Sequence, residues 1–398
     1  MSADRIDFLI VGSGAAGVRA SETIRRRDRE AQIVVVSADP HPFYNRILLS
    51  KDFLKRDDLA PDDIVMKPLP LWERQGIELR CGRRAVRLDA QERRLRLDTG
   101  EVLLYERCLV ATGARPRRLP VPGGDDPGLH TLRSLDDGLR LRRAAREASR
   151  AVVVGGGLLG VEVGAALAGR GLPVTVVECE AWLFGRMAPE AVGRALKEIL
   201  EGGGVRVLTS VTVTGFERDK DGYRVATRSP GGSPGPLLTA ELVVVAVGVV
   251  PETAFVHGAP LAADGGIVVD AGLRAAPGLW TAGDVAAWPD PIAGLRHRVE
   301  HWVHAQRQGR VAGNNMTGGK KEFAELTSYD TELFGTPVQV VGAPLRARSW
   351  DVEGLAVEGV AWGSCNGRVV AVYSIGRTGL TRSEMRELGR GAPDLEPL

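Results

Sequence analysis

The pattern that most constrains this chain is a short apolar strand followed at once by closely spaced glycines and a helix, and it occurs twice. The first copy reads DFLIVGSGAAG, in which Phe8 to Val11 is a continuous apolar run and Gly12, Gly14 and Gly17 follow. An uninterrupted apolar run is typical of a strand buried on both faces of a parallel sheet. In such a unit the first glycine allows a tight turn and the second lets the backbone approach a pyrophosphate. The third lets the helix pack against the strand, and the helix N-terminus faces the phosphates.

The second copy, AVVVGGGLLG, is the more complete of the two. Its glycines, Gly155, Gly157 and Gly160, keep the spacing of the first set, and a helix and a second apolar strand follow. Glu178 ends that strand, where a carboxylate hydrogen-bonds a ribose 2′-hydroxyl and repels a 2′-phosphate. Glu180 adds to the repulsion. This copy therefore predicts a nucleotide site that favours NADH over NADPH.

The first copy lacks so clear an acid. Its second strand ends in Ser-Ala-Asp, so that Asp39 is the only carboxylate within reach of a ribose. A basic loop with Arg46 and Lys51 comes next and opens a helix. A cation beside a pyrophosphate has an obvious use, although a solvated surface turn would explain Arg46 alone.

Composition limits the class of protein. The 398 residues suggest two or three domains, and 44% hydrophobic with 26% charged residues is ordinary for a soluble protein with sizeable cores. A net charge of +2 gives no reason to expect nucleic acid, and no apolar stretch is long enough to span a bilayer. The N-terminus runs directly into the first strand, so a cytoplasmic protein without a signal peptide is expected.

The four cysteines are scattered: Cys81, Cys108, Cys179 and Cys365. None forms a CxxC or CxxxxC pair, which excludes a redox-active dithiol of adjacent cysteines. Buried free thiols are expected at all four positions, and no metal site is predicted.

Two further stretches end strands in small residues. The segment 108–116 is read as a short buried strand whose last residues let backbone come close to a ligand. The segment 278–285 is another apolar strand, and it runs into Gly283 and Asp284. Asp284 can hold polyol hydroxyls, but as the N-cap of a helix it would need no ligand.

The other expected elements follow from periodicity and turn residues. Antiparallel meanders are predicted over 77–104, with turns at 89–91 and 99–100, and over 205–228, and a Pro/Gly-rich linker over 116–128 marks a domain boundary. Helices are predicted over 15–25, 135–147, 161–167, 189–201, 299–316 and 381–388, and strands over 33–36, 174–177, 242–248, 338–341, 355–362 and 369–373.

Two dinucleotide fingerprints imply two nucleotides, and a flavin with a nicotinamide is the natural pair because hydride passes between them. The order of motifs resembles the flavoproteins with two dinucleotide-binding domains that are related to glutathione reductase. GSGAAG is similar to that family's FAD motif, VATGARPR to its linker motif, VVVGGGLLGVEVGAAL to its NADH motif and GLWTAGDVA to its second FAD motif.

The resemblance implies an α/β fold with two Rossmann-like domains, the NADH domain being inserted in the FAD domain, and a small α+β C-terminal domain. The expected boundaries are 1–115 with 245–320 for FAD, 116–244 for NADH and 321–398 for the C-terminal interface domain.

The subfamily is indicated by two motifs. The stretch YNRILLSK (44–51) is similar to the Y-x-R-x-x-L-S-K of oxygenase-coupled ferredoxin reductases, rubredoxin reductases and apoptosis-inducing-factor-like proteins, and stands where disulfide reductases carry cysteines. YNRILLS also resembles the flavin domain of assimilatory nitrite reductases. RVEHWVHA (298–305) is similar to the R-x-E-x-W-x-x-A of ferredoxin reductases, whose Trp lies by the flavin ring. By itself, Trp302 would more often be a core residue.

The sequence departs from the family in three places. Ala38 holds the usual place of the ribose acid, Tyr329-Asp330 replaces an aromatic-Trp pair, and Glu252 replaces an Asn after G-x-x-P. Carried onto this chain, the resemblance implies that Arg46 contacts the FAD pyrophosphate and Asp284 the ribitol. It also implies that Lys51 lies near flavin N5 and pairs with Glu162.

The site residues implied by the motifs are these. Lys51, Glu162 and Trp302 are the expected catalytic residues. The expected FAD residues are Gly12, Ser13, Gly14, Ala15, Ala16, Gly17, Asp39, Arg46, Lys51, Val86, Ala111, Thr112, Gly113, Arg115, Asp284, Val285, Glu300 and Trp302. The expected NADH residues are Gly155, Gly157, Leu158, Leu159, Gly160, Glu162, Glu178 and Gly248.

The function implied is that of a flavoprotein reductase that passes hydride from NADH to FAD and then single electrons to a small iron–sulfur protein, ferredoxin or rubredoxin. Arg115, Arg117 and Arg118 are candidates for a basic acceptor surface, and a solvated turn explains them equally well. Two alternatives stay open: an NADH-responsive redox-sensing protein like apoptosis-inducing factor, and the electron-input subunit of a nitrite or nitrate reductase. The chain is expected to be a monomer or a homodimer, with neither nucleic acid nor membrane as a partner.

Overall fold

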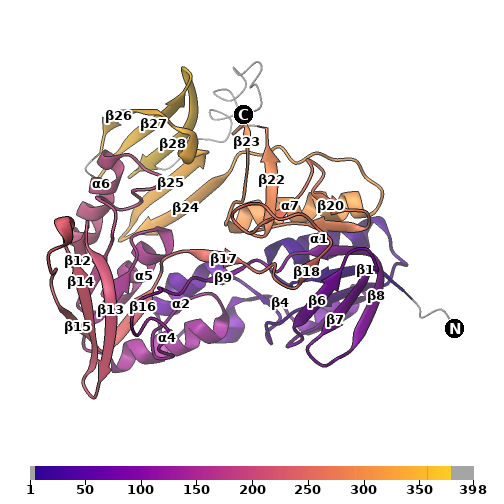
Figure 1. Ribbon diagram of the computed structural model, residues 1–398, viewed down its shortest axis with the longest axis horizontal. Coiled ribbons are helices and arrows are strands. Elements are labelled where there is room, and N and C mark those ends of the chain that lie inside the picture. The colour runs from indigo at the N-terminus through magenta and orange to yellow at the C-terminus, as the bar shows by residue number, and fades with distance from the viewer. Residues whose placement is uncertain (1–4, 292, 356, 378–398) are drawn as a thin grey trace.

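Two parallel sheets carry the two glycine turns. The computed structural model describes residues 5–291, 293–355 and 357–377 of this α/β protein. Figure 1 shows the first sheet at one end of an elongated molecule, the second at the other end, and a C-terminal sheet lying over the second.

The first sheet is built around the predicted apolar strand. Its parallel strands run in the order β5-β2-β1-β8-β21. Leu9 and Ile10 of β1 are completely buried, as expected of a strand covered on both faces. The elements are β1 (Ile6–Val11), α1 (Ala15–Arg27), β2 (Ile33–Val36), β5 (Ile77–Arg80), β8 (Val102–Val110) and β21 (Leu279–Thr281).

An antiparallel extension continues this sheet beyond β8. The N-terminal half of β8 pairs with β7 (Arg94–Leu97), which pairs with β6 (Ala85–Asp89), so both predicted turns are confirmed. The prediction of one meander from 77 to 104 is wrong at its start, because β5 joins the parallel sheet beside β2. A short strand with one exposed face shows alternating apolar and polar residues in both parallel and antiparallel sheets. Only the neighbouring strand therefore decides whether the pairing is parallel or antiparallel. Short strands β18 (Val256–His257) and β20 (Arg274–Ala276) complete the edges.

The second sheet repeats the plan of the first. Its four parallel strands run in the order β12-β11-β10-β16. The prediction that 205–228 is one meander is wrong in the same way, since β12 pairs in parallel with β11. The elements are α4 (Leu135–Glu147), β10 (Ala151–Val154), α5 (Leu158–Ala168), β11 (Val174–Val177), α6 (Glu190–Gly202), β12 (Val205–Leu208), antiparallel β13 (Thr212–Asp219), β14 (Gly222–Arg228) and β15 (Leu238–Ala240), and β16 (Leu242–Val245).

The chain passes from one sheet to the other and back through two adjacent segments. β9 (Ala114–Pro116) leads out and β17 (Val249–Pro251) leads back, and the two pair antiparallel with Val249 opposite Pro116. We propose that the NADH domain is inserted between these strands.

Helix α7 (Trp302–Met316) lies against α1 at very short range. A Cβ on Gly309 would lie 2.2 Å from the Ala16 carbonyl oxygen, and one on Gly313 would lie 2.7 Å from that of Ala20. Small residues at this spacing let the two backbones touch, which fixes the start of α7 beside the first glycine turn. The helix begins at Trp302, later than the predicted residue 299, and follows β19 (Ile267–Val268), β22 (Ala286–Asp290) and β23 (Leu295–His297).

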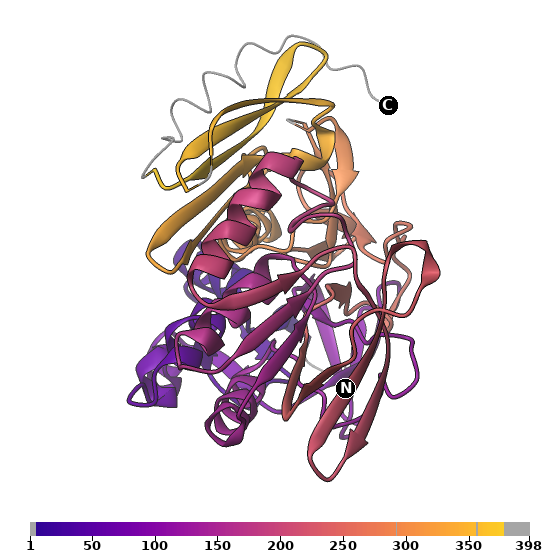
Figure 2. The same ribbon diagram turned by 90° about the vertical axis from the view of Figure 1, so that its left-hand side faces the viewer.

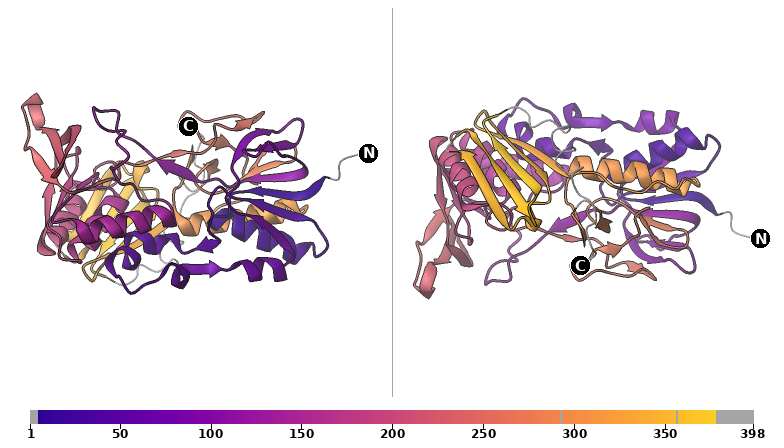
Figure 3. Two further views of the ribbon diagram at one scale, coloured as in Figure 1. Left: turned by 90° about the horizontal axis from the view of Figure 1, so that it is seen from below. Right: turned by 90° about the horizontal axis from the view of Figure 1, so that it is seen from above.

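The C-terminal sheet is antiparallel, with the order β24-β25-β28-β27-β26. Figures 2 and 3 show it above α6, while α7 extends over the other half of the molecule. The strand predicted over 355–362 is confirmed only over 359–362, which belong to β27. The helix predicted over 381–388 lies outside the described residues. The strands are β24 (Ser328–Leu333), β25 (Thr336–Gly342), β26 (Ser349–Gly354), β27 (Gly359–Cys365) and β28 (Arg368–Ile375).

The hairpin between β24 and β25 anchors this sheet to the second parallel sheet. Leu333 is completely buried in a core shared with α5 and α6. The ring of Phe334 covers Gly203, where a Cβ would lie 2.2 Å from the ring. The remaining short elements are β3 (Phe43–Tyr44), β4 (Val65–Lys67), α2 (Asp52–Lys55), α3 (Leu69–Arg74) and the 3₁₀ helices η1 (Arg46–Ser50), η2 (Pro61–Ile64), η3 (Pro230–Gly232) and η4 (Pro344–Arg346).

Candidate functional site

The three glycines of the first turn have separate physical roles. Gly12 has a φ of +113°, and a Cβ there would lie 2.2 Å from the Ala111 carbonyl oxygen. A Cβ on Gly17 would lie 1.9 Å from the Gly12 carbonyl oxygen, whereas one on Gly14 would touch nothing within 4 Å. Gly14 is also the N-cap of α1 and supplies no side chain to its free N–H groups. The helix start therefore faces open space in which an anionic group fits.

A cavity opens in front of this turn, between the carboxyl ends of β1, β8 and β21 and the start of α7. Most of the predicted FAD residues line it. They are Gly12, Ser13, Gly14, Ala15, Ala16, Asp39, Arg46, Ala111, Thr112, Gly113, Asp284, Glu300 and Trp302.

Five predicted FAD residues do not line this cavity. Gly17 and Val285 are buried behind it, and the Arg115 side chain turns to Glu252, with 3.0 Å between Nε and Oε1. Lys51 pairs with Glu162, which lines a second cavity. The prediction that Val86 contacts FAD through its side chain is wrong. This side chain is 38% exposed, and the neighbouring Ala85 lines the cavity instead. The pairing of β6 with β7 has a register shift between Ala85 and Arg87, and such an irregularity changes which side chain faces the cavity.

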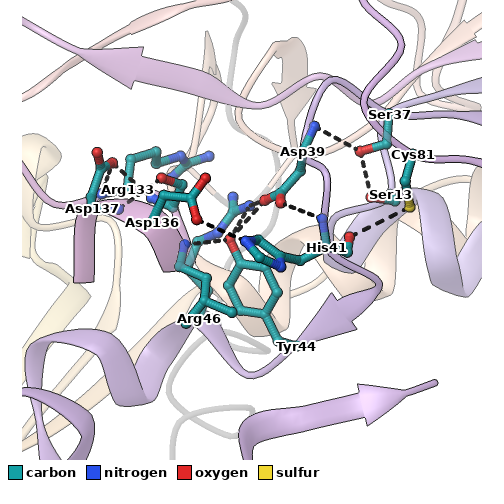
Figure 4. A network of polar contacts seen from close by, with 12 residues as sticks. Ser13, Ser37, Asp39, His41, Tyr44, Arg46, Cys81, Arg133, Asp136 and Asp137 are labelled. Atoms are coloured by element: carbon teal, nitrogen blue, oxygen red, sulfur yellow. Dashed lines mark hydrogen bonds and ion pairs between the residues drawn. The ribbon is translucent and has the colours of Figure 1, made fainter. Parts of the chain in front are cut away.

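Asp39 is engaged by its own loop, as Figure 4 shows. The Tyr44 hydroxyl donates to Asp39 Oδ2 at 2.7 Å, and the His41 amide donates to Oδ1 at 3.0 Å. The Arg46 guanidinium lies 3.6 Å from the same carboxylate. Burial raises the pKa of Tyr44, which keeps its hydroxyl a donor. The carboxylate thereby holds the loop in which Arg46 stands.

Two residues that line the cavity each carry a buried nitrogen atom without a partner among the described residues. The atoms are Nε of Arg46 and Nδ1 of His301. An unpaired buried polar atom is costly, so such atoms indicate a ligand that supplies hydrogen-bond partners. Together with the open helix start, they fit the pyrophosphate and ring system of FAD.

Asp284 contacts a residue that the motifs did not predict. Arg133 Nη2 donates to Asp284 Oδ2 at 2.8 Å, and it occupies the space that a side chain on Gly113 would need. The N-cap interpretation of Asp284 is wrong, because β22 follows it and not a helix. Arg133 stands just before α4, far from both glycine motifs in the chain, so spacing alone carried no signal for it.

The start of α7 brings two rings to the cavity, those of His301 and Trp302. Trp302 stacks on Phe43 with 5.3 Å between centroids and 11° between planes. His301 meets the edge of Tyr329 from β24 at 5.1 Å. Burial lowers the pKa of His301 to about 4 and raises that of Tyr329 to about 12, so both rings are neutral at pH 7. Burial likewise raises the pKa of Glu300.

The second glycine turn repeats the geometry of the first. Gly155 has a φ of +111°, with its Cβ position 2.4 Å from the Ala246 carbonyl oxygen, and the Cβ position of Gly160 lies 1.9 Å from the Gly155 carbonyl oxygen. Gly157 again faces open space. The Glu178 carboxylate accepts from the Gly156 amide at 2.5 Å and from the Glu180 amide at 2.8 Å.

A second cavity lies in front of this turn and is walled on its far side by the C-terminal sheet. Of the predicted NADH residues, Gly157, Leu158, Leu159, Glu162 and Gly248 line it, whereas Gly155, Gly160 and Glu178 do not.

The two cavities share three lining residues, Arg46, Arg133 and Glu300. The predicted pair of Lys51 and Glu162 is present near this junction, with 3.4 Å between Nζ and Oε1. None of the four cysteines lines either cavity, and all four lie in the described part of the chain. The expectation of four buried thiols is wrong, since Cys179 is exposed and only Cys108 is buried.

This chain is similar to known proteins over most of its length. Residues 6–309 match the family model described as pyridine nucleotide-disulphide oxidoreductase. The ferredoxin–NAD(+) reductase component of an anthranilate 1,2-dioxygenase system from Burkholderia cepacia is 33% identical over 86% of this chain and 82% of its own length. Mouse (Mus musculus) apoptosis-inducing factor 3 is 33% identical over 84% of this chain and 55% of its own length.

A solved structure of a ferredoxin reductase has the same fold. The ferredoxin reductase for the CYP199A2 system from Rhodopseudomonas palustris superposes with a TM-score of 0.86 at 28% identity, covering 97% of this chain and 94% of that one. Within the described residues, no helix is both long and apolar enough to cross a membrane.

Proposed function

The chain belongs to the pyridine nucleotide-disulphide oxidoreductase family, and from this we propose that it is an NADH-dependent, FAD-containing reductase. We infer that its electrons leave singly to a small iron–sulfur protein of the ferredoxin or rubredoxin type, as the names of its ferredoxin reductase relatives suggest. We place this reaction in the cytoplasm, where NADH is supplied.

The observation that carries the proposal is the meeting of the two cavities. Each begins at a glycine turn that accommodates a pyrophosphate, and they share Arg46, Arg133 and Glu300. Two dinucleotides that start at opposite turns therefore end at one place, as hydride transfer requires. No cysteine of the described chain lines either cavity, which argues against a disulfide reductase.

When bound, FAD accepts hydride from the nicotinamide and releases electrons one at a time. The chain's own residues bind, orient and supply charge. The two helix starts and Arg46 bind the phosphates. The ion pair of Arg133 and Asp284 lines the FAD cavity, and Trp302 closes one side of that cavity. We propose Lys51 and Glu162 as the charged pair beside the reacting atoms and Trp302 as the ring beside the flavin.

Stopped-flow spectroscopy of the flavin-loaded protein tests this function. Anaerobic mixing with NADH should bleach the flavin absorbance within about a second, in the range of ordinary enzyme turnover. Subsequent mixing with an oxidised ferredoxin or rubredoxin should restore the absorbance equally fast, and dithionite in place of NADH serves as the control that bypasses the nicotinamide site.

A different result would favour the redox-sensor alternative. If a complex with NADH forms and then persists for minutes in air and with either acceptor present, electron delivery is not the function. Transfer only to a nitrite or nitrate reductase partner would instead indicate the electron-input subunit.

A further inference from the structure

The Glu162 carboxylate is held by residues of two segments that are far from it and from each other in the sequence, 50–51 and β24. It stands on α5, and its side chain is 9% exposed. The Ser50 hydroxyl donates to Oε2 at 2.6 Å, and the Thr331 hydroxyl of β24 donates to Oε1 at 2.6 Å. Lys51 Nζ lies 3.4 Å from Oε1, and Glu162 is the one acidic partner of Lys51 in the described chain.

We propose that Ser50 and Thr331 are positioning residues for the pair formed by Lys51 and Glu162, so that the C-terminal sheet takes part in the redox site. This inference rests on the proposed function, because it assumes that NADH reduces FAD beside that pair. It assigns a role in catalysis to a strand that has no nucleotide-binding motif of its own.

The physical reason is the burial of the carboxylate. A buried ion is stable only where a counter-ion and hydrogen-bond donors satisfy its oxygens. Two neutral donors and one cation share the two oxygens of Glu162, so the position of the carboxylate, and with it that of the Lys51 ammonium, depends on all three. Removal of the Ser50 donor leaves Oε2 without its hydrogen bond, and removal of the Thr331 donor leaves Oε1 with Lys51 alone, so the carboxylate moves towards the donors that remain.

We expect the C-terminal sheet to stay in place without the Thr331 hydroxyl. Leu333, which is completely buried at the end of β24, and Phe334, which follows it and covers Gly203, already anchor this hairpin. The loss of one hydroxyl should therefore leave the sheet where it is while changing the position of Glu162.

Thr331→Val tests the proposal, since it keeps the volume and removes the donor. In the flavin-loaded protein, the limiting rate of flavin reduction by NADH should fall about tenfold, the order of a lost hydrogen bond to a charged group. Thr331→Ser restores the donor and should stay within about twofold of the wild-type rate. Ser374→Ala is the matched control, because this buried hydroxyl of the same sheet has no partner among the described residues.

A double-mutant cycle separates positioning from packing. In a Glu162→Ala background, Thr331→Val should change the rate by less than about twofold, because its partner is gone. Urea unfolding, which requires no turnover, should show the same coupling between the two positions. Ser50→Ala provides a second variant on the other oxygen if Thr331→Val does not fold.

The proposal is overturned if NADH reduces the flavin of Thr331→Val as fast as that of the wild type. This holds even if urea unfolding shows coupling between positions 162 and 331, because the hydroxyl then contributes to stability alone. An additive cycle overturns it as well. Neither result touches the proposed function, which fails separately if the wild-type flavin is not reduced by NADH or not reoxidised by an iron–sulfur protein.

Discussion

The glycines of the two turns show how differently one residue type is used within a single motif. A side chain at the first or third glycine would collide with backbone, so these positions secure the fold. The middle glycines, Gly14 and Gly157, have ordinary negative φ values and empty space at the Cβ position. They are kept free for what binds there.

This difference predicts the behaviour of a matched pair of variants. Gly157→Ala should lower the affinity for NADH about tenfold or more while the flavin content stays normal, because the added methyl group projects only into the second cavity. Gly14→Ala should instead lower the flavin content. Both proteins should unfold within about 1 kcal/mol of the wild type, because alanine can adopt these φ values and replacing glycine at an N-cap costs about that much at most. Isothermal titration with NADH, flavin absorbance and urea unfolding check the three claims.

The opposite result would contradict the assignment of FAD to the first glycine turn and NADH to the second. If Gly157→Ala lost flavin and retained NADH binding, the nucleotides would have to be exchanged between the two turns.

At the scale of an element, α7 couples the first glycine turn to a cluster of buried rings. Its first turn carries His304, whose ring meets the edges of Trp288 and Phe323 at 5.3 Å and 5.0 Å. Burial lowers the pKa of His304 to about 3 and that of His301 to about 4. Both imidazoles are therefore neutral in the folded protein. Nε2 of His304 has no partner among the described residues.

These two pKa values predict a loss of stability in acid. The unfolded chain binds protons on both histidines near pH 6.5 and the folded protein only near pH 3 to 4, so stability is fully present above about pH 6.5 and falls as the pH is lowered. At pH 5 each histidine should cost about 2 kcal/mol. Urea unfolding of the wild type and of His304→Phe at pH 7 and pH 5 measures the contribution, and the variant should lose about half of the acid sensitivity.

His257→Gln serves as the control, since His257 is exposed on β18. A wild type equally stable at both pH values would show that the two rings are not buried as described. The same conclusion would follow if His304→Phe lost as much stability at pH 5 as the wild type.

At the scale of the whole molecule, the paired strands β9 and β17 place basic residues beside the second cavity. Pro116 and Val249 line that cavity, and Arg117 and Arg118 follow in the linker. Arg117 donates to the Val249 carbonyl and Arg118 to the Asp125 carbonyl, and neither forms an ion pair with a described residue. Their charges are available to a partner, whereas that of Arg115 is neutralised by Glu252.

A double variant tests this surface. Arg117→Glu with Arg118→Glu should slow the second-order reduction of an acidic iron–sulfur acceptor about tenfold at low salt, because attraction becomes repulsion, and the difference should shrink at high salt. The rate of flavin reduction by NADH should not change. Arg206→Glu on β12, an exposed arginine at the far edge of the second sheet, is the matched control. Equal acceptor rates for both variants at every salt concentration would exclude the linker as the docking surface.

Local sequence patterns were sufficient to predict the elements that have a clear signal of their own. The apolar runs that became β1, β10 and β16, the glycine turns, and the helix over 135–147 with its capping Ser134 depend on neighbours within a few residues, so the sequence by itself determined them. The pair of Lys51 and Glu162 was expected only through the resemblance to a family.

Contacts between distant segments were decided by the tertiary structure alone. The strands at 77–80 and 205–208 took their direction from their partners, and the face of the strand at 85–86 depended on register. Arg133 on Asp284, and Ser50 and Thr331 on Glu162, join positions more than a hundred residues apart. No spacing rule links such residues, because they meet only when the two parallel sheets and the C-terminal sheet have packed together, and that packing is where the site is completed.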